Sequence, residues 1–501
     1  MKKIIFASAV VIAMGLASCS EYLDINTDPN APAAKDVSTD MIFPAVEMNL
    51  AVTYGDYLRI TGGYYSQIYA HLAGTSNYVD YSQFSMSATR SSGSYSQLYQ
   101  KVLQNAKTVM DKASSAEDWG TYLAAVTLRA FALETLVDMY GETPYKDALD
   151  PANIAPKFDE GIDVYKGVIA ELDEALSKAS ATMPVTTNFI FKGQSAENWI
   201  KFAKSLKFKM LIRMGDIASA QALVEDDNFI TSDVKLANCW KQEAQQESPF
   251  WAEEFSTLGG STQENVVANL AIIGTMLQKD GEGNVIYQDP RLAEYFVPNT
   301  SGEFVGNISG TNMSTASEPF KNADYWCRPV ASYDMPVYFI TVAEVDFFLA
   351  EYYLLKEDAA KAADYYEQAI AASCATNGLT AADAATILAQ YPYNGKENIA
   401  VQKWIALAGV NPFEAYCEVR RLDYPAFDTT LKGSDMFSGS GALNTSAYKP
   451  GTLYTPYQVD HEVGDNKLLE RWPYAEAAQS RNPNTPKFKG YTTPIFWAAA
   501  E

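Results

Sequence analysis

The chain has 501 residues, with 61 acidic and 38 basic side chains, which gives a formal net charge of -23 at pH 7. This charge excludes a protein that binds the nucleic-acid backbone, because that backbone attracts a basic surface. His71 and His461 are the only histidines, which excludes a histidine-rich metal site. The composition therefore favours ligands that are neutral or weakly charged.

The N-terminus resembles the export signal of a bacterial lipoprotein. Two lysines precede an apolar run at 4–16, which is too short for a typical transmembrane helix. The run ends in the residues Leu-Ala-Ser-Cys, a pattern similar to a lipobox. The sequence predicts a signal peptide at 1–18 and lipidation of Cys19, so that acyl chains would hold the mature protein on a membrane. No later apolar run is long enough to span a bilayer.

A tether is predicted at 19–44, because residues 24–32 are dense in turn formers. A single domain is expected to occupy 45–501. Its first helices are predicted near 44–54 and 95–113, with an irregular stretch rich in Tyr, Gly and Ser between them, at 62–94.

The chain then predicts helices that fold back on each other in pairs. A strong helix at 122–140 ends at Gly141, and Pro144 prevents its continuation. Its partner is expected at 162–176. A second pair is predicted at 199–213 and 216–225, and Pro412 opens the last helix of another pair at its first turn, where proline is tolerated.

The best-formed pair lies at 343–376, with helices predicted at 342–356 and 359–373 and a charged turn at 356–358. Six residues fit the 34-residue tetratricopeptide pattern, in which small side chains let two helices approach: Leu349, Ala350, Tyr353, Ala362, Tyr366 and Ala369. Asp346 replaces the leading aromatic residue and Cys374 replaces the closing proline. An ordinary helical hairpin is the alternative interpretation.

One such hairpin cannot bury its apolar face alone. We therefore predict a mostly α fold, in which four tetratricopeptide-like helical hairpins form a scaffold, at about 122–176, 199–225, 341–373 and 398–421. The remaining long segments, 226–336 and 432–501, are rich in turns. Long loops in a compact protein are usually functional, so they are expected to form an irregular, loop-rich ligand-binding part, beside 62–94.

No motif for phosphate, dinucleotide, zinc-protease or serine-hydrolase chemistry is present. No cofactor and no metal site are predicted. Residues 280–284 are interpreted as a turn, because they lack the alternating oxygen ligands of a calcium loop. Four cysteines are widely spaced and are predicted to be buried free thiols, although a disulfide between two of them remains an alternative: Cys239, Cys327, Cys374 and Cys417.

Aromatic residues in predicted loops suggest a ligand site. Sugar rings have apolar faces that stack on flat aromatic rings, and their hydroxyls need planar polar partners. The candidate residues combine both types: Asn77, Tyr78, Tyr81, Trp251, Tyr325, Trp326 and Arg328. The alternative is that these rings fasten loops onto the scaffold, since aromatic residues dominate packing everywhere.

A series of short motifs runs in a fixed order along almost the whole mature chain: the residues at 22–30, 129–131, 138–145, 191–193, 199–213, 289–291, 341–345, 350–351, 402–404, 418–421 and 471–476. No single motif is specific. Together they resemble the SusD/RagB-like outer-membrane lipoproteins of Bacteroidota, in the SusD-like branch. The chain departs from the usual pattern at Tyr95, where tryptophan is frequent, and at Lys204, where asparagine is common.

The resemblance implies a non-catalytic, cell-surface lipoprotein, held in outer-membrane lipid through Cys19. It also implies a partner, a SusC-like TonB-dependent transporter, to which the protein passes a captured nutrient, usually a glycan. The loops that bind ligand in relatives correspond to Asn77, Tyr78 and Tyr81, and to Tyr325, Trp326 and Arg328.

A glycan is therefore the first hypothesis for the ligand, and capture of peptides or glycopeptides by the same protein is the second. A glycoside hydrolase and a scaffold that binds only proteins are further alternatives. Plentiful acidic residues leave the hydrolase open, because the separation of two catalytic carboxylates is not visible in a sequence.

Overall fold

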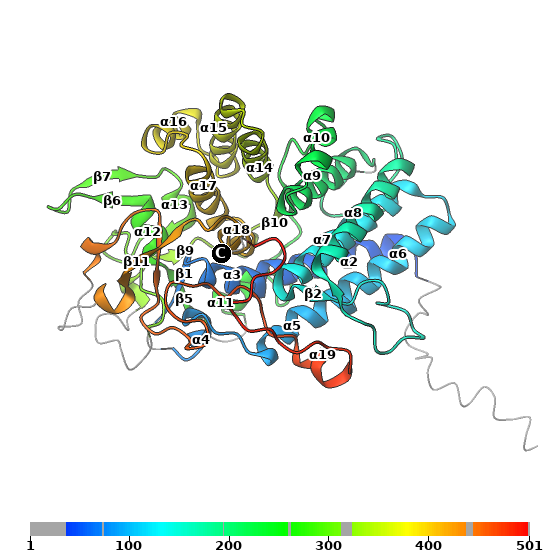
Figure 1. Ribbon diagram of the computed structural model, residues 1–501, viewed down its shortest axis with the longest axis horizontal. Coiled ribbons are helices and arrows are strands. Elements are labelled where there is room, and N and C mark those ends of the chain that lie inside the picture. The colour runs from blue at the N-terminus through cyan, green and yellow to red at the C-terminus, as the bar shows by residue number, and fades with distance from the viewer. Residues whose placement is uncertain are drawn as a thin grey trace, which may run out of the picture.

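The structure, a computed structural model, describes residues 37–72, 75–193, 195–258, 262–311, 323–436 and 444–498. It is mostly helical, with a few two-stranded sheets, and this confirms the predicted fold class. Figure 1 shows two groups of helices, α6–α10 on the right and α14–α17 at the top, with α18 near the centre and most short strands on the left. The predicted signal peptide, Cys19 and most of the predicted tether lie outside the described residues.

The first long helix begins earlier than expected. It comprises α2 (Thr39–Thr53), a π-helical turn η1 (Tyr54–Leu58) and α3 (Arg59–Tyr65). The prediction of a tether up to residue 44 was therefore wrong at its end. Pro44 lies inside α2 and removes one backbone donor, but Phe43 and Val46 are fully buried and their packing holds the first turns in place.

The stretch at 62–94 is also more regular than predicted. It contains the end of α3, strand β1 (Tyr69–His71), helix α4 (Val79–Ser82) and most of α5 (Ala88–Gln97). Helix α5 continues through η2 (Leu98–Leu103) into α6 (Gln104–Ser115). The Ser87 side chain accepts a hydrogen bond from Arg90 N and starts α5, seven residues before the predicted start near Tyr95.

The helices of the scaffold pair in chain order, as the sequence predicts. The pairs are α7 (Trp119–Tyr140) with α8 (Gly161–Lys178), α9 (Glu197–Arg213) with α10 (Ile217–Asp226), α14 (Val342–Leu355) with α15 (Ala359–Thr376), and α17 (Lys396–Ala408) with α18 (Pro412–Leu422). Helix α7 ends at Gly141, whose φ of +79° favours glycine. Helix α16 (Ala381–Gln390) was not predicted, although Thr380 and Asp383 form a capping box at its start.

The small residues of the predicted tetratricopeptide pattern lie where two helices approach. Ala350, Ala362 and Ala369 are fully buried between α14 and α15. Tyr366 is buried beside them, and Tyr353 stacks on Tyr365 with ring centroids 5.3 Å apart. A similar close approach joins the N-terminal helix to α18, because Gly62 lies against the main chain of Phe413 and leaves no room for a Cβ.

The loop-rich part is built from short helices and from pairs of short strands. The strand pairs are β1 with β5 (Val266–Ala268), β2 (Glu142–Thr143) with β3 (Asp159–Glu160), β4 (Val234–Leu236) with β10 (Val337–Ile340), β6 (Leu277–Lys279) with β7 (Val285–Gln288), β8 (Phe296–Val297) with β9 (Arg328–Pro329), and β11 (Ala426–Lys432) with β12 (Thr452–Thr455). Only the last pair is parallel among those described. The short helices are α11 (Pro249–Glu254), α12 (Leu270–Met276), α13 (Leu292–Tyr295), α19 (Glu476–Arg481), η3 (Ala323–Tyr325), η4 (Gly433–Met436) and η5 (Thr445–Ala447).

These elements correct the prediction that 226–336 and 432–501 are irregular throughout. Residues 280–284 form the turn of the β6–β7 hairpin, as predicted, and Asp280 accepts hydrogen bonds from the backbone of Glu282 and Asn284. The C-terminal segment returns to the scaffold, where Trp472 N donates to Met139 O and Trp497 Nε1 donates to Asp138.

Within the described ranges, α7 is the one helix that is long and apolar enough to cross a membrane, and 89% of its apolar window is buried inside the protein. A helix that is buried to this extent packs in the core of the protein. The four predicted free cysteines are free thiols. Cys327, Cys374 and Cys417 are buried, whereas Cys239 is half-buried.

Candidate functional site

The structure brings the predicted ligand residues into one region, which we call the aromatic region: α4, α11, β1, β5, β8 and β9. The labels of α4, α11, β1, β5 and β9 lie left of the centre of Figure 1, from mid-height downwards. Strand β5 pairs with β1 on one side, and its Ala268 N donates to Cys327 O, next to β9. Residues near 77–81, 251 and 325–328, far apart in the sequence, are therefore neighbours in space.

Tyr78 and Tyr81 of this region belong to the core. Their rings are stacked with centroids 5.5 Å apart, and they are 5% and 0% exposed. Tyr78 Oη donates to Glu253 of α11 and Tyr81 Oη donates to Tyr57. Burial raises the pKa of Tyr81 to about 12. Neither ring offers a free face to a sugar, so both fasten the loop before α4 onto the scaffold.

Trp326 is likewise buried, with 1% of its surface exposed. It packs with Leu72 and Val267 in a small apolar cluster, and the ring of Tyr325 meets it edge-on at 4.8 Å. The packing of Ala70, Leu72 and Val267 against the indole argues against stacking of Trp326 on a ligand, which stays an untested prediction. Its burial favours the alternative interpretation, a ring that fastens a loop.

Four of the predicted residues remain accessible, since Asn77, Trp251, Tyr325 and Arg328 are half-buried. Arg328 lies 2.8 Å from Glu264 and 3.4 Å from Asp324. These contacts leave the region with flat rings beside charged groups. Such a surface can stack on a sugar and hydrogen-bond its hydroxyls.

Carboxyl groups lie beneath this surface. Burial, together with the charges of Glu253 and Glu254, raises the pKa of Asp56 to about 7. Burial also raises the pKa of Glu254, against the hydrogen bond that it accepts from Asn265 N at 2.8 Å. In the part of the chain that the structure describes, no group of three or more His, Cys, Asp or Glu residues could hold a metal ion.

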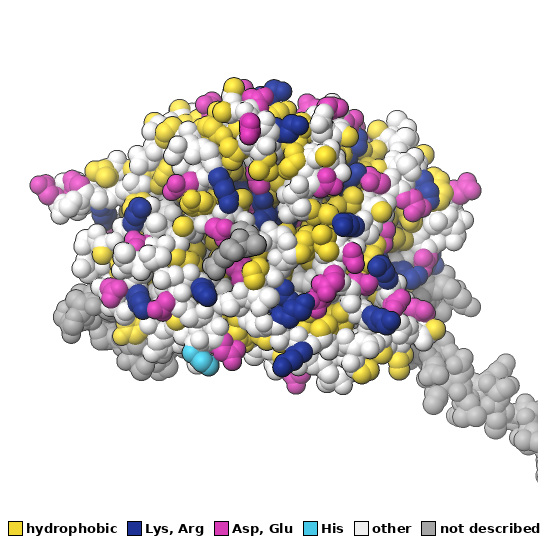
Figure 2. Space-filling view, in the orientation of Figure 1, with side chains coloured by type: hydrophobic (Ala, Val, Ile, Leu, Met, Phe, Trp, Pro, Cys, Tyr) yellow, Lys and Arg dark blue, Asp and Glu magenta, His cyan; other side chains and the backbone are white. Residues whose placement is uncertain are grey.

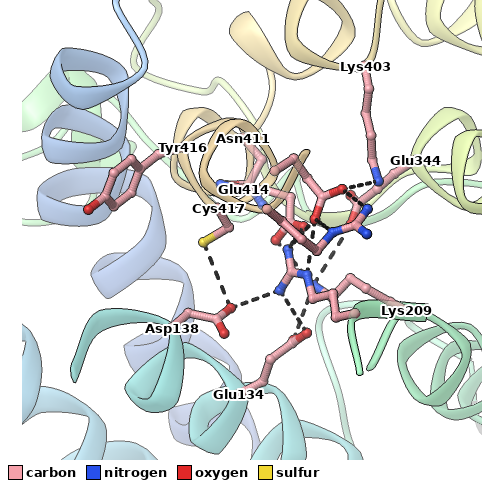
Figure 3. Close-up of polar contacts among 12 residues, drawn as sticks. Glu134, Asp138, Lys209, Glu344, Lys403, Asn411, Glu414, Tyr416 and Cys417 are labelled. Atoms are coloured by element: carbon pink, nitrogen blue, oxygen red, sulfur yellow. Dashed lines mark hydrogen bonds and ion pairs between the residues drawn. The ribbon is translucent and has the colours of Figure 1, made fainter. Parts of the chain in front are cut away.

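A second group of charged residues lies inside the scaffold, and we call it the ion network (Figure 3). It joins α7, α9, α14, α17 and α18, and each side chain is at most 8% exposed. Its members are Glu134, Asp138, Lys209, Arg213, Glu344, Glu351, Lys403, Glu414, Glu418 and Arg421.

Arg213 forms the centre of the ion network. Its Nη1 lies 3.1 Å from Glu134 and 2.8 Å from Asp138, and its Nη2 pairs with Glu414 and Glu418. Lys403 Nζ pairs with Glu418 at 2.7 Å. The network as a whole therefore ties all four helical hairpins together through charge pairs that water does not screen.

The ion network shifts carboxyl pKa values in both directions. Burial raises the pKa of Glu344 to about 8 and that of Glu134 to about 7. Burial also disfavours the charged form of Glu418, but the cations of Arg421, Lys403 and Arg213 outweigh it and hold the pKa well below its usual range. Perturbed carboxyls often mark catalytic sites. Here a substrate cannot reach them, so the network is structural.

Sequence reasoning missed the ion network, although a signal was present. Several members are spaced four residues apart on helices whose neighbouring positions are apolar: Glu134 and Asp138, Lys209 and Arg213, Glu414 and Glu418. This spacing places both charges on one helix face. The short motifs at 138–145, 199–213, 402–404 and 418–421 contain many of these residues.

Comparison with known proteins agrees with the fold. A SusD-like family model, described as "Starch-binding associating with outer membrane", matches residues 29–438. A SusD homolog from Bacteroides uniformis is similar in structure, with a TM-score of 0.72 and 21% identity over 93% of this chain and 100% of that chain.

Two further solved structures are similar over most of the chain. A chitin-binding protein has a TM-score of 0.68 and 17% identity over 91% of this chain and 100% of that one. A SusD homolog from Parabacteroides distasonis has a TM-score of 0.69 and 18% identity over 90% of this chain and 98% of that one. No curated protein matches the chain significantly.

Proposed function

The chain belongs to the SusD-like family, and from this membership we propose that it is a cell-surface lipoprotein that captures oligosaccharides or polysaccharides for uptake. The observation that carries the proposal is the family match over residues 29–438, whose description names starch binding at the outer membrane. The chitin-binding protein among the similar structures supports a neutral polysaccharide as the ligand class.

Membrane attachment would occur through lipid on Cys19. The lipobox-like residues before Cys19 and the outer-membrane association of the family support this part of the proposal. A Cys19→Ser variant should be released as a soluble protein from cells that retain the wild type in the outer membrane. Attachment that survives the substitution would refute the lipid anchor.

Transfer would require a partner, and a SusC-like TonB-dependent transporter is the partner that the family resemblance implies. The transporter should co-purify with the lipoprotein extracted from outer membranes in mild detergent. Recovery of the lipoprotein as a monomer under those conditions would count against transfer to such a barrel.

The protein would bind its ligand without chemical conversion. The carboxyls of the ion network, whose pKa values are strongly shifted, are closed to solvent. The half-buried rings Trp251 and Tyr325, with Arg328, suit stacking and hydrogen bonding. Peptides or glycopeptides are the second candidate ligand class, because the Arg328 guanidinium beside Glu264 and Asp324 could also bind peptide groups. A glycoside hydrolase is the third, and product release from any glycan would support it.

Binding of residues 20–501 to a panel of neutral glycans and of peptides tests the proposal. Retention by a glycan class would support it, and Trp251→Ala should then weaken the affinity about fivefold, since a stacked ring contributes about 1 kcal/mol. Binding of peptides alone would replace the glycan by the second ligand class. Trp326→Ala is the matched control, because it removes a ring of the same region that is buried.

A further inference from the structure

A cavity of about 590 Å³ lies outside the aromatic region, between α18, β11 and the C-terminal segment. We call it the α18 cavity. Its walls are the last turn of α18, residues 425–429, residues 466–470 and residues 492–494. Helix α18 lies near the centre of Figure 1, with β11 to its left. The volume falls within the range of about 300–1,000 Å³ that is typical of small-molecule sites.

Buried arginines fix the walls of this cavity. The Arg420 guanidinium is 1% exposed, and it donates to Glu470 O at 2.6 Å and to Asp138 O at 3.0 Å. Arg471 donates to Thr493 O at 2.8 Å and to Pro494 O at 2.7 Å. The cavity is therefore formed before any ligand arrives, which lowers the entropic cost of binding.

The wall residues from β11 are held as well. Strand β11 pairs with β12, and Thr455 of β12 bonds Asn466 twice, since its Oγ1 donates to Asn466 Oδ1 at 3.0 Å and accepts from Asn466 N at 2.9 Å. Lys432 forms an ion pair with Asp465 beside this contact. Three segments that are remote in sequence thus keep a constant spacing.

The mouth of the cavity carries polar groups that are available to a ligand. Lys467 and Thr429 are exposed, and Thr492 is half-buried. Among the residues that the structure describes, none forms a side-chain hydrogen bond or an ion pair with these three. Asp423 and Glu470, which already take part in contacts of their own, also belong to the lining.

The floor is apolar and rigid. Val419 and Leu468 are buried, and the half-buried Phe427 ring and Pro425 continue the surface. Arg420 offers little to an anionic ligand, because its donors already serve main-chain carbonyls. The lining holds two cations, Lys467 and Arg420, and two acids, Asp423 and Glu470. Positive and negative groups are therefore balanced, which favours a neutral ligand.

Sugars match this lining, because they are neutral and combine apolar C–H faces with many hydroxyls. We propose that the α18 cavity binds a short neutral oligosaccharide, at a site separate from the aromatic region. This inference rests on the proposed function of glycan capture and gives it a second, preformed site. The apolar floor would face the C–H surface of the sugar rings, and Lys467, Thr429 and Thr492 would bond hydroxyls at the mouth.

Two neighbouring threonines of β11 provide a matched test. Thr429 lines the cavity, whereas Thr430 is exposed and does not line it, because successive side chains of a strand point to opposite faces. Thr429→Trp should fill the mouth and weaken binding at least tenfold, while Thr430→Trp should change it less than twofold. The probes are maltotriose, cellotriose, xylotriose, mannotriose and chitotriose, measured by calorimetry on residues 20–501.

A smaller change provides a second variant if Thr429→Trp does not fold. Lys467→Ala removes one donor from an exposed position and should weaken binding of the same trisaccharide about threefold to tenfold. Thermal melting of each variant checks that it is folded.

The outcomes separate this inference from the proposed function. If Thr429→Trp and Lys467→Ala bind as the wild type does, the α18 cavity is not the site, although glycan capture stands. Loss of binding in Tyr325→Ala alone would then place the site in the aromatic region. A wild type that binds none of the trisaccharides, but is retained by a polysaccharide, overturns the cavity proposal alone. A wild type that binds no saccharide overturns both.

Discussion

The ion network and the α18 cavity share helix α18 but use their polar side chains in opposite ways. The ion network encloses ten charged side chains that are at most 8% exposed, and every one of them is paired inside the scaffold. The cavity presents Lys467, Thr429 and Thr492 to solvent. The comparison shows that the enclosed charges hold helices together, while the accessible polar groups lie where a ligand could reach them.

The charge balance of the ion network explains its shifted carboxyls. Four cations face six carboxyl groups, since Lys209, Arg213, Lys403 and Arg421 are the only bases among its ten members. Two of the acids, Glu134 and Glu344, have pKa values raised to about 7 and about 8. When both are protonated, four carboxylates face four cations, and no net charge is buried.

The largest effect is expected from removal of Arg213. Arg213→Met would leave the Glu134, Asp138, Glu414 and Glu418 carboxylates without their shared cation, and breaking a buried charge pair costs about 3–5 kcal/mol. Urea unfolding of residues 20–501 measures the loss in unfolding free energy.

Arg129→Met is the matched control for this change. Arg129 pairs with Glu171 at 3.0 Å, with side chains that are 14% and 28% exposed, so its loss should cost about 1 kcal/mol or less. An equal loss of unfolding free energy in the two variants would show that the buried ion pairs stabilise the protein no more than a partly exposed pair does.

The next largest effect concerns the aromatic region. Trp326→Ala should destabilise the protein by about 3 kcal/mol, near the low end for a buried tryptophan, because its apolar cluster is small and can relax. Once the variant is folded, glycan affinity should be unchanged. A variant of normal stability that has lost glycan binding would restore Trp326 as a ligand residue and would weaken the distinction between packing and binding rings.

The sequence predicts much of the scaffold, because its signals are local. Gly141 ends α7 as expected, and Ala350, Ala362 and Ala369 lie in the predicted helix contact. Helix α5 was missed at its start because Ser and Gly have low helix propensity. That segment is held by tertiary contacts instead, such as the hydrogen bond from Ser91 Oγ to Pro473 O at 3.0 Å.

The binding regions are harder to predict, because their properties depend on distant segments. The indole of Trp326 is covered by Leu72 and Val267, which no pattern around residue 326 indicates. The α18 cavity combines three segments between residues 419 and 494, none of which carries a motif for sugar binding. Sequence reasoning could therefore name these aromatic residues as ligand candidates, while the exposure of each ring was not predictable.

The pH dependence of the unfolding free energy tests a buried carboxyl outside the ion network, Glu47. Burial raises the pKa of Glu47 to about 8, against two backbone hydrogen bonds that favour its charged form. Between the unfolded value of 4.5 and pH 8, the folded state keeps a proton that the unfolded state has lost. Stability from this group is therefore complete below pH 4.5 and falls as the pH rises towards 8.

The slope is best measured between pH 6.5 and pH 8. His71 adds a rise in stability near pH 6.5, because burial lowers its pKa to about 4 from an ordinary value of 6.5, but this contribution is the same in the wild type and in a Glu47 variant. The unfolding free energy should fall by about 1 kcal/mol per pH unit for the Glu47 proton, and Glu47→Gln should remove that part of the slope. The part that remains in the variant belongs to groups such as Glu344. An unchanged slope in Glu47→Gln would show that Glu47 is ionised in the folded protein at neutral pH.

The smallest effect is expected from the solvent-exposed ion pair of α9. Lys204 stands where asparagine is common in the proteins that the chain resembles, and it pairs with Asp226 at the surface. Its side chain is 20% exposed and that of Asp226 is 48% exposed, so Lys204→Asn should lower the unfolding free energy by less than about 1 kcal/mol.

Most of that loss should disappear in 1 M salt, because salt screens exposed charges. Lys209 lies on the same helix and inside the ion network, and salt should not reduce the cost of Lys209→Met in the same way. A similar salt dependence for both variants would mean that water reaches the network, and the contrast between an enclosed scaffold and an open binding part would fail.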